Sequence, residues 1–451
     1  MARTFWLETL GCPKNQVDSD KLAGAMQRDG LEPADAPDLA DLVVVNTCAF
    51  VEEARQESID TVLALSRERA AHAQVVVTGC LAERYGDELA DALPEVDLVA
   101  GFGVDVVPAP RSAPVPVTIA AGPASAGRRP RSTPVPSFDL LELPRPAATA
   151  PWAYLKVAEG CDRACGFCAI PSFRGKQRSR SIPDLLAEVD ALDAREIVLV
   201  AQDLASYGRD QGRGRRDLVP LVEAVAARVD WVRLLYLYPS ELTAGLVDAV
   251  LATGVPYFDL SLQHVSGPLL RRMRRWGDGD RFLGRIGAIR RDEPGAVFRS
   301  NFIVGYPGET EGDHDQLLAF VEAAQLDWCG FFRFSREPDT HADGLDGQVP
   351  DGLVAERLAE LCERQDAITA ARRDELIGSE VRVLVDHPGT ARSYREAPEI
   401  DGVVSVPDEL APGTFADLVV VDALGPDLVA EIPDRRAAGV GAAAGEAGGA
   451  A

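Results

Sequence analysis

Apolar runs alternate with amphipathic stretches along the first hundred residues of the chain. Residues 4–11, 42–47 and 74–79 are strand-like, and a helical segment follows each of them. Each run leads into a turn that carries a cysteine, so Cys12, Cys48 and Cys80 are separated by 36 and 32 residues. A strand–helix–strand unit takes roughly 30 residues. The pattern therefore predicts an open parallel α/β sheet with all three cysteines at its carboxyl edge, where such sheets bind ligands.

A second region of alternation begins at residue 152 and contains six strand-like runs. These runs cover residues 152–158, 196–201, 232–238, 257–262, 297–304 and 330–334. Amphipathic stretches lie between them, and residues 353–377 are predicted to form a long closing helix. Six consecutive βα units predict a parallel (βα)6 part-barrel.

The remaining segments have a different character. Residues 108–150 are rich in Pro, Ala and Ser and are predicted to be a linker. Short β runs after residue 378, split by Pro, Gly and Asp, predict a small antiparallel β-barrel. The Gly/Ala-rich tail is predicted to be disordered. The expected organisation is thus an α/β chain with segments 1–107, 108–150, 151–377, 378–436 and 437–451.

Composition narrows the possible functions. The chain of 451 residues carries a formal net charge of −25, which disfavours direct nucleic-acid binding and suits a basic protein partner. The sequence contains no apolar run of about 18 residues, so no membrane-spanning helix is predicted. The first residues lack a secretory signal pattern, so a cytoplasmic location is expected. Eight cysteines in such a chain favour metal ligands or structural thiols over disulfides.

The strongest chemical signal is a cysteine triplet after the first strand of the second region. Cys161, Cys165 and Cys168 have the spacing C-x3-C-x2-C. Three thiolates can hold three irons of a four-iron cluster and leave the fourth iron open for chemistry. A zinc site would need a fourth ligand, and no second cysteine pair lies nearby. A third interpretation is that the cysteines are structural thiols packed in a core. This is disfavoured, because the three cysteines lie within eight residues on a polar loop.

The amino-terminal cysteines are a weaker signal when each is taken singly, because structural cysteines are common at strand ends. Their repetition at one sheet edge favours a second three-cysteine cluster, again with an open iron. Cys329 and Cys362 lie outside both sets and are predicted to be small buried hydrophobic residues.

Longer motifs around these cysteines resemble the methylthiotransferases, a family of radical S-adenosylmethionine enzymes. LGCPKNQVDSD, VVVNTCAF and VVVTGCLAERY resemble their amino-terminal domain, and LKVAEGCDRACGFCAIPSFRGKQRSR resembles their radical domain. ARSYREAPEIDG, which begins at Ala391, resembles the carboxy-terminal domain of one branch, and the final barrel resembles a TRAM domain. That branch modifies ribosomal protein S-twelve.

The resemblance implies a cofactor set and a substrate. Cys161, Cys165 and Cys168 are expected to hold the radical cluster, which cleaves S-adenosylmethionine to a hydrogen-abstracting radical. Cys12, Cys48 and Cys80 are expected to hold an auxiliary four-iron cluster that delivers sulfur. The substrate would be an aspartate β-carbon on a basic small-subunit ribosomal protein. Two molecules of S-adenosylmethionine per turnover, an electron donor and a sulfur donor would be needed.

Fainter signals concern the binding of S-adenosylmethionine. We expect its site to be lined by residues of the cysteine loop and of loops that follow barrel strands, namely Phe167, Gln202, Gly305 and Glu309. For the glycine-rich loop that contains Gly305, the conformational needs of a turn are a sufficient alternative explanation. Ser300 and Asn301 stand where the family resemblance leads us to expect two threonines, so residue assignments on that strand are insecure.

Two polar groups near the fourth strand also invite interpretation. Two interpretations of Gln263 and His264 are equally open. They line a cavity, or they form a hydrogen-bonded polar pair in the core. The arginines between residues 271 and 275 are predicted to form a solvated helix face.

The charge of the last domain bears on the substrate. Residues 378–436 contain 12 Asp/Glu against 5 Arg, which should repel transfer RNA and attract a basic protein loop. The main alternative is a methylthiotransferase acting on an anticodon-adjacent adenosine of transfer RNA. An iron–sulfur electron carrier is a further alternative, but a carrier gains nothing from open irons.

Overall fold

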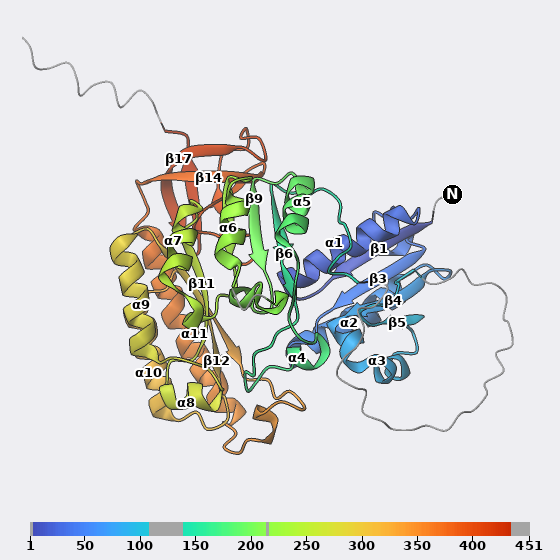
Figure 1. Ribbon diagram of the computed structural model, residues 1–451, viewed down its shortest axis with the longest axis horizontal. Helices are drawn as coiled ribbons and strands as arrows, with labels where there is room; N and C mark the ends of the chain where they lie inside the picture. The colour runs from blue at the N-terminus through green and yellow to red at the C-terminus, as the bar shows by residue number, and fades with distance from the viewer. Residues whose placement is uncertain (1–2, 108–138, 213–215, 434–451) are drawn as a thin grey trace, which may run out of the picture.

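The computed structural model describes residues 3–107, 139–212 and 216–433, which form three domains in contact (Figure 1). The predicted disordered tail and residues 108–138 of the predicted linker lie outside these ranges. No helix of the described ranges is both long enough and apolar enough to span a membrane.

The amino-terminal domain is an open parallel sheet, as predicted. It has five strands in the order β2-β1-β3-β4-β5. Strands β3 and β4 are buried along their whole length, because their runs of valine lie between helices on both faces. Its elements are β1 (Thr4–Thr9), α1 (Pro13–Arg28), β2 (Glu32–Pro33), β3 (Leu42–Thr47), α2 (Glu52–Glu68), β4 (Gln74–Gly79), α3 (Cys80–Ala92) and β5 (Leu98–Ala100).

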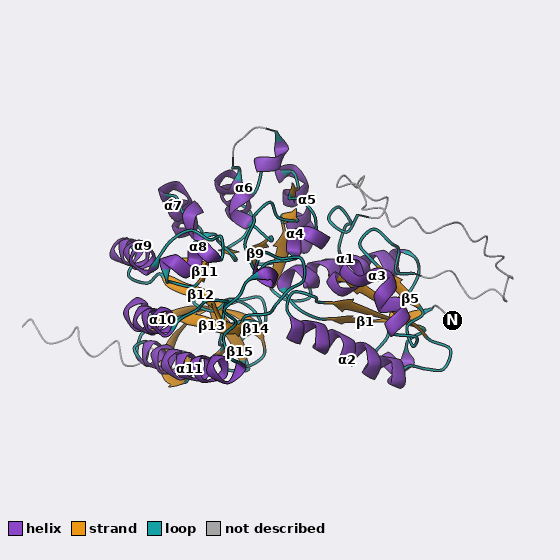
Figure 2. Cartoon of the chain, turned by 90° about the horizontal axis from the view of Figure 1, so that it is seen from below, coloured by secondary structure: helices purple, strands orange, loops and turns teal. Residues whose placement is uncertain are grey.

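The central domain is the predicted part-barrel. Its parallel strands form two sheets, β10-β9-β6 and β11-β12-β13, which a parallel bridge between Leu237 and Leu260 joins. Helices cover the outside of the strands (Figure 2). The strands are β6 (Trp152–Lys156), β9 (Glu196–Val200), β10 (Trp231–Leu234), β11 (Tyr257–Gln263), β12 (Val297–Val304) and β13 (Trp328–Arg333). The helices are α5 (Ile182–Leu192), α6 (Leu218–Ala226), α7 (Ala244–Ala252), α8 (Gly267–Arg272), α9 (Gly279–Asp292), α10 (Glu311–Ala324) and α11 (Asp351–Asp374).

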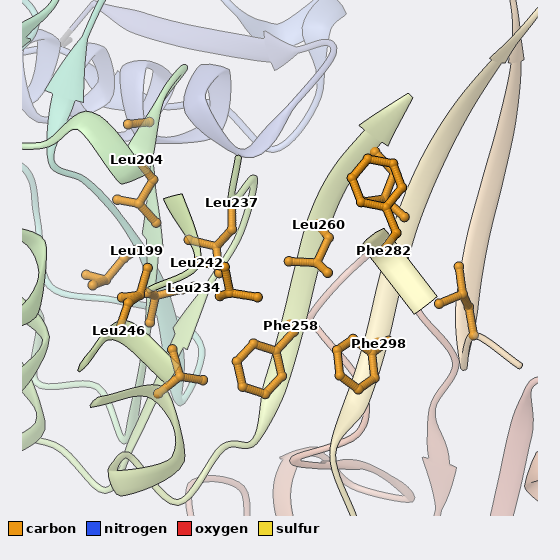
Figure 3. Packing of buried hydrophobic residues seen from close by; sticks show 14 of the residues in the cluster. Leu199, Leu204, Leu234, Leu237, Leu242, Leu246, Phe258, Leu260, Phe282 and Phe298 are labelled. Atoms are coloured by element: carbon orange, nitrogen blue, oxygen red, sulfur yellow. The ribbon is translucent and has the colours of Figure 1, made fainter. Parts of the chain in front are cut away.

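The main core lies between these strands and their covering helices. Leu199, Leu234 and Phe258 project from successive strands toward the helices, where Leu242 and Leu246 meet them (Figure 3). The rings of Phe258 and Phe298 stack with centroids 5.4 Å apart. This continuous apolar layer keeps the six strands in one curved surface, so that their carboxyl ends open onto a common site.

The carboxy-terminal domain is a small closed barrel in the order β14-β15-β16-β18-β17. Its strands are β14 (Glu380–His387), β15 (Thr390–Ser393), β16 (Val404–Ser405), β17 (Phe415–Leu424) and β18 (Asp427–Glu431). The predicted antiparallel pairing holds except between β16 and β18, which pair in parallel where the barrel closes.

This small barrel packs against the amino-terminal ends of the part-barrel strands. Arg392 pairs with Glu196, the first residue of β9, at 2.7 Å, and Glu196 also accepts a hydrogen bond from Arg233 at 2.8 Å. All three side chains are buried. Ligand loops lie at the opposite, carboxyl ends of such strands, so the domain supports the site from behind.

The described end of the predicted linker is packed rather than free. Leu140 and Leu141 are buried, and Lys21 of α1 donates to the backbone oxygen of Leu141 at 2.7 Å. Arg145 forms an ion pair with Asp20. Residues 139–150 therefore tie the amino-terminal domain to the part-barrel, a role that the Pro-rich composition concealed.

Candidate active site

The loop that carries Cys161, Cys165 and Cys168 follows β6 and is fixed by backbone hydrogen bonds. Gly166 donates its N–H to Met273 O at 2.8 Å and accepts from Ala342 N at 2.8 Å. A Cβ at Gly166 would lie 3.0 Å from the hydroxyl of Tyr306, so the close approach favours glycine. The three sulfur atoms are thus presented by a braced loop.

Cys161 and Cys168 lie in surroundings that favour the neutral form of their thiols until a metal binds. Burial raises the pKa of Cys161 to about 11 and that of Cys168 to about 12. The backbone N–H of Arg163 donates to Cys161 Sγ at 3.3 Å. Metal binding has to displace these protons, because the thiolate is the ligand.

Arg275 also reaches this loop, which corrects the prediction that residues 271–275 form a solvated helix face. Its Nη1 donates to Cys165 Sγ at 3.4 Å, and its other terminal nitrogen donates to Ser261 O. The guanidinium lies 4.0 Å from the ring centroid of Tyr238. Cys165 is 110 positions away along the chain, so no local pattern could have revealed this contact.

The amino-terminal cysteines lie together at the carboxyl edge of their sheet, as predicted. Cys48 and Cys80 directly follow β3 and β4, whose ends pair as Thr47 with Gly79. A Cβ on Gly11 would lie 3.0 Å from Cys48 Sγ, which places the turn before Cys12 against Cys48. The amide of Asn15 ties the turns together, since it donates to Leu10 O at 2.9 Å and Thr47 O at 3.1 Å.

These three thiols do not share one electrostatic environment. Burial raises the pKa of Cys48 to about 12 and also raises that of Cys80. The pKa of Cys12 is lowered, because Lys14, Arg174 and two backbone N–H groups outweigh the cost of desolvation.

Arg174, on the loop after the third radical-domain cysteine, connects the two cysteine sets. It donates to Cys80 Sγ at 3.0 Å and to Asn15 Oδ1 at 2.9 Å in the amino-terminal domain. It also donates to both carboxylate oxygens of Glu159, at 2.9 and 3.0 Å. Sequence reasoning missed this residue, because its partner Cys80 lies 94 positions away.

A buried ionic network surrounds this arginine. Lys156 donates to Asp18 at 2.6 Å and forms a second ion pair with Glu159. Although burial opposes ionisation, Arg174 and Lys156 hold the pKa of Glu159 well below its usual range. The network spans the interface between α1 and β6 and reaches Cys80 from the loop that follows the radical-domain cysteines.

The donor chemistry of each set fits a four-iron cluster. Each supplies three thiols and leaves one iron position without a protein ligand. In the described ranges, no three Cys, His, Asp or Glu side chains converge on a single metal position. A cluster binds each thiolate at a different iron, so its ligands need no such convergence, whereas a zinc ion does.

Comparison with known proteins agrees with this architecture. Three family profiles match, described as Uncharacterized protein family UPF0004 over residues 4–101, the Radical SAM superfamily over residues 155–321 and the TRAM domain over residues 377–432. The ribosomal protein uS12 methylthiotransferase RimO of Cutibacterium acnes is 40% identical, over 95% of this chain and 97% of its own. RimO of Moorella thermoacetica is 43% identical, over 90% of this chain and 93% of its own.

The chain belongs to the RimO family of radical S-adenosylmethionine methylthiotransferases. RimO of Saccharopolyspora erythraea is similar to the same degree, at 42% identity over 95% of both chains. Among solved structures, the radical S-adenosylmethionine methyltransferase TsrM of Kitasatospora setae aligns with a TM-score of 0.49 and 14% identity, over 86% of this chain and 80% of that chain.

The four residues predicted to contact S-adenosylmethionine in this RimO-family chain differ in their surroundings. Gln202 follows β9 and donates to Glu159 Oε1 at 2.8 Å, whereas its own Oε1 is buried without a partner among the described residues. An orphaned buried acceptor is costly unless a ligand completes it, so Gln202 fits the cofactor site. Phe167 is half-buried and packs against the main core.

Glu309, which the sequence predicts to contact S-adenosylmethionine, is held by hydrogen bonds within the protein. One carboxylate oxygen accepts from the N–H groups of Gly305 and Tyr306, at 2.5 and 3.2 Å. The other accepts from Arg357 at 2.9 Å. Because both oxygens are engaged, the geometry supports a brace that shapes the Gly305 loop, where φ is +82°.

Three further sequence interpretations can be placed in the fold. His264 is buried, and its Nδ1 accepts a hydrogen bond from Ser266 N at 3.1 Å, whereas its Nε2 has no partner among the described residues. Cys329 on β13 is half-buried. Cys362 is exposed on α11, so its prediction as a buried hydrophobic residue is wrong. The buried positions of α11 form a stripe along the helix, and residue 362 lies outside that stripe.

Proposed function

We propose that this chain methylthiolates the β-carbon of an aspartate side chain in ribosomal protein uS12. The substrate is inferred from the relatives, which are uS12 methylthiotransferases, and the chemistry is inferred from one observation. That observation is the buried network in which Arg174 bonds Cys80 of one cysteine set from the loop that carries the other. Such a connection keeps a site of hydrogen removal beside a site of sulfur delivery.

Two iron–sulfur clusters are part of this proposal. Cys161, Cys165 and Cys168 would hold the radical cluster, and Cys12, Cys48 and Cys80 would hold the auxiliary cluster. When bound, the clusters and two molecules of S-adenosylmethionine supply the radical, the sulfur and the methyl group. Gln202 and Phe167 would contact S-adenosylmethionine, and Gly305 would allow the backbone to approach it.

The chain itself would orient the reactants and exclude water. The network around Glu159 would exclude water locally, because its members are buried and bonded to one another. Arg163 is held by Asp203 at 2.6 Å and lies over the ring of Tyr238, with its guanidinium 3.9 Å from the centroid. These contacts fix the loop between the first two radical-domain cysteines.

A protein substrate fits this chain better than transfer RNA. The carboxy-terminal barrel is acidic by count, although Asp386, Glu396 and Asp401 are buried and add little to its surface field. An RNA-binding surface requires clustered Lys and Arg, whereas Arg392 is buried and occupied by Glu196 and Asp386. We therefore expect no direct nucleic-acid binding by this domain. The reaction would take place in the cytoplasm, with an external electron donor and an external sulfur donor.

The decisive experiment offers both substrates to anaerobically reconstituted enzyme. Recombinant uS12 and a transfer-RNA anticodon arm are incubated separately with S-adenosylmethionine, sulfide and reductant. We expect the mass increase of one methylthio group on an aspartate of uS12 and none on the RNA. Modification of the RNA alone would overturn the proposal.

Iron content tests the two clusters. Wild-type protein should contain about eight irons, and replacing either cysteine set by alanine should leave about four. A wild-type content of about four irons would contradict the auxiliary cluster.

A further inference from the structure

The chain contains four lysines, and Lys14 is unlike the others. Lys21 and Lys156 are fully buried and lie 3.7 Å from Glu188 and 2.6 Å from Asp18. Lys176 is exposed on the loop after the radical-domain cysteines. Lys14 is half-buried, and none of the described carboxylates forms an ion pair with it.

Lys14 lies between the two domains, over an aromatic ring. It belongs to the first turn of α1, two residues after Cys12, and its Nζ is 3.6 Å from the ring centroid of Tyr236. Tyr236 follows β10 of the part-barrel, and Asp259 holds its backbone N–H at 2.9 Å. The ammonium group therefore lies where the amino-terminal cysteine edge meets the carboxyl ends of the barrel strands.

The ring holds the cation without neutralising it. A cation–π contact stabilises an ammonium group by about 0.5–2 kcal/mol, and the N–H donors that point away from the ring remain free for an acceptor. Three arginines of the part-barrel domain are already paired with carboxylates, and Arg275 is held by Cys165 Sγ and Ser261 O. Arg163 pairs with Asp203 and Glu241, Arg174 with Glu159 and Asp18, and Arg299 with Asp259 and Asp401.

We propose that Lys14 binds the carboxylate of the target aspartate and thereby selects an aspartate side chain as the substrate. This inference rests on the proposed function. A carboxylate that leaves water needs a charged partner in the site, and Lys14 is a half-buried cation at the junction of the two domains that pairs with no carboxylate of the described ranges. The carboxylate carbon is bonded to the β-carbon, so holding the carboxylate also positions the carbon that reacts. An adenosine base carries no carboxylate and would gain nothing from this lysine.

The test combines a substrate change with an enzyme change. Recombinant uS12 with Asp or Asn at the target position is titrated against reconstituted wild-type, Lys14→Met and Lys14→Arg enzymes. Lys176→Met is the control, because it removes an exposed lysine by the same substitution. Binding, KM and kcat are measured together with iron content, the electronic spectrum of the clusters and deoxyadenosine formation without uS12.

Wild-type enzyme should bind the Asp form about 10- to 100-fold more tightly than the Asn form, as expected for a charged hydrogen bond. Lys14→Met should remove this discrimination by weakening binding of the Asp form alone, with unchanged iron content and spectrum. Lys14→Arg should retain part of it, and Lys176→Met should retain all of it.

The outcomes separate this inference from the function on which it rests. Unchanged Asp/Asn discrimination in Lys14→Met would overturn the role of Lys14 while leaving the proposed function intact. Loss of iron or an altered cluster spectrum in Lys14→Met would overturn it as well, because Lys14 would then support the cluster. Failure of the wild-type enzyme to modify the Asp form would overturn the proposed function itself.

Discussion

Replacing Arg174 by methionine removes the cation that joins the two cysteine sets. The side chain of Arg174 is only 3% exposed and pairs with Glu159 at 2.9 Å and Asp18 at 3.4 Å. Methionine fills a similar volume, so the substitution mainly deletes charge and hydrogen bonds. It removes the Arg174 donors to Asn15 Oδ1 and Cys80 Sγ and leaves two buried carboxylates with less charge compensation.

The expected cost follows from the partners that remain. Breaking a buried ion pair by removing one member costs about 3–5 kcal/mol. Lys156 still pairs with both carboxylates, and Gln202 still donates to Glu159, so we expect the lower limit, about 3 kcal/mol. Arg178→Met is the matched control on the same loop. Its side chain is 39% exposed and pairs with Asp139, so its loss should cost about 1 kcal/mol or less.

Amide hydrogen exchange of α1 and β6 measures this cost directly in metal-free protein. Exchange reports local opening, whereas a single unfolding free energy is poorly defined for a three-domain chain. A loss of about 3 kcal/mol should accelerate exchange about 100-fold at this interface, since 1.4 kcal/mol corresponds to a factor of ten. Arg178→Met should accelerate it about fivefold at most.

The reasoning would be refuted if Arg174→Met and Arg178→Met gave equal acceleration at the interface. That result would mean that Lys156 alone satisfies the network. Acceleration spread evenly over all three domains would also contradict it, because the network touches only the amino-terminal domain and the part-barrel.

Three further substitutions test the structure elsewhere. Gly79→Ala should destabilise the amino-terminal domain by about 3 kcal/mol, because φ is +90° and the new Cβ would lie 2.6 Å from Thr47 O and closer still to Asn46 Oδ1; an unchanged melting temperature would contradict this. Phe258→Ala should cost about 3–5 kcal/mol in urea unfolding, since the ring is fully buried, and a cost below about 1 kcal/mol would contradict the packing shown in Figure 3. Burial lowers the pKa of His264 to about 4, against the opposing charge of Asp313. The unfolded chain then binds the extra proton, so stability is fully present above about pH 6.5 and about 3 kcal/mol is lost as the pH falls toward 4. His264→Gln should remove that part of the pH dependence measured by urea unfolding, and an identical pH profile would refute the assignment.

The sequence by itself determined the order of elements and both cysteine sets. Valine-rich runs that end in a cysteine place Cys48 and Cys80 at one sheet edge wherever parallel strands form, because consecutive βα units repeat the same local geometry. The triplet at Cys161 needs only a loop of eight residues. Such features depend on local periodicity and spacing, which can be read without knowing the fold.

Only the tertiary structure decided which polar side chains meet these cysteines. Arg174 reaches Cys80 across 94 positions, and Arg275 reaches Cys165 across 110 positions. Neither contact leaves a periodic trace, since any exposed arginine has the same local pattern. Likewise, the engagement of both oxygens of Glu309 depends on Arg357, which another helix supplies. Long side chains find their partners through the packing of whole domains, and so the chemistry surrounding the clusters is a property of the assembled fold.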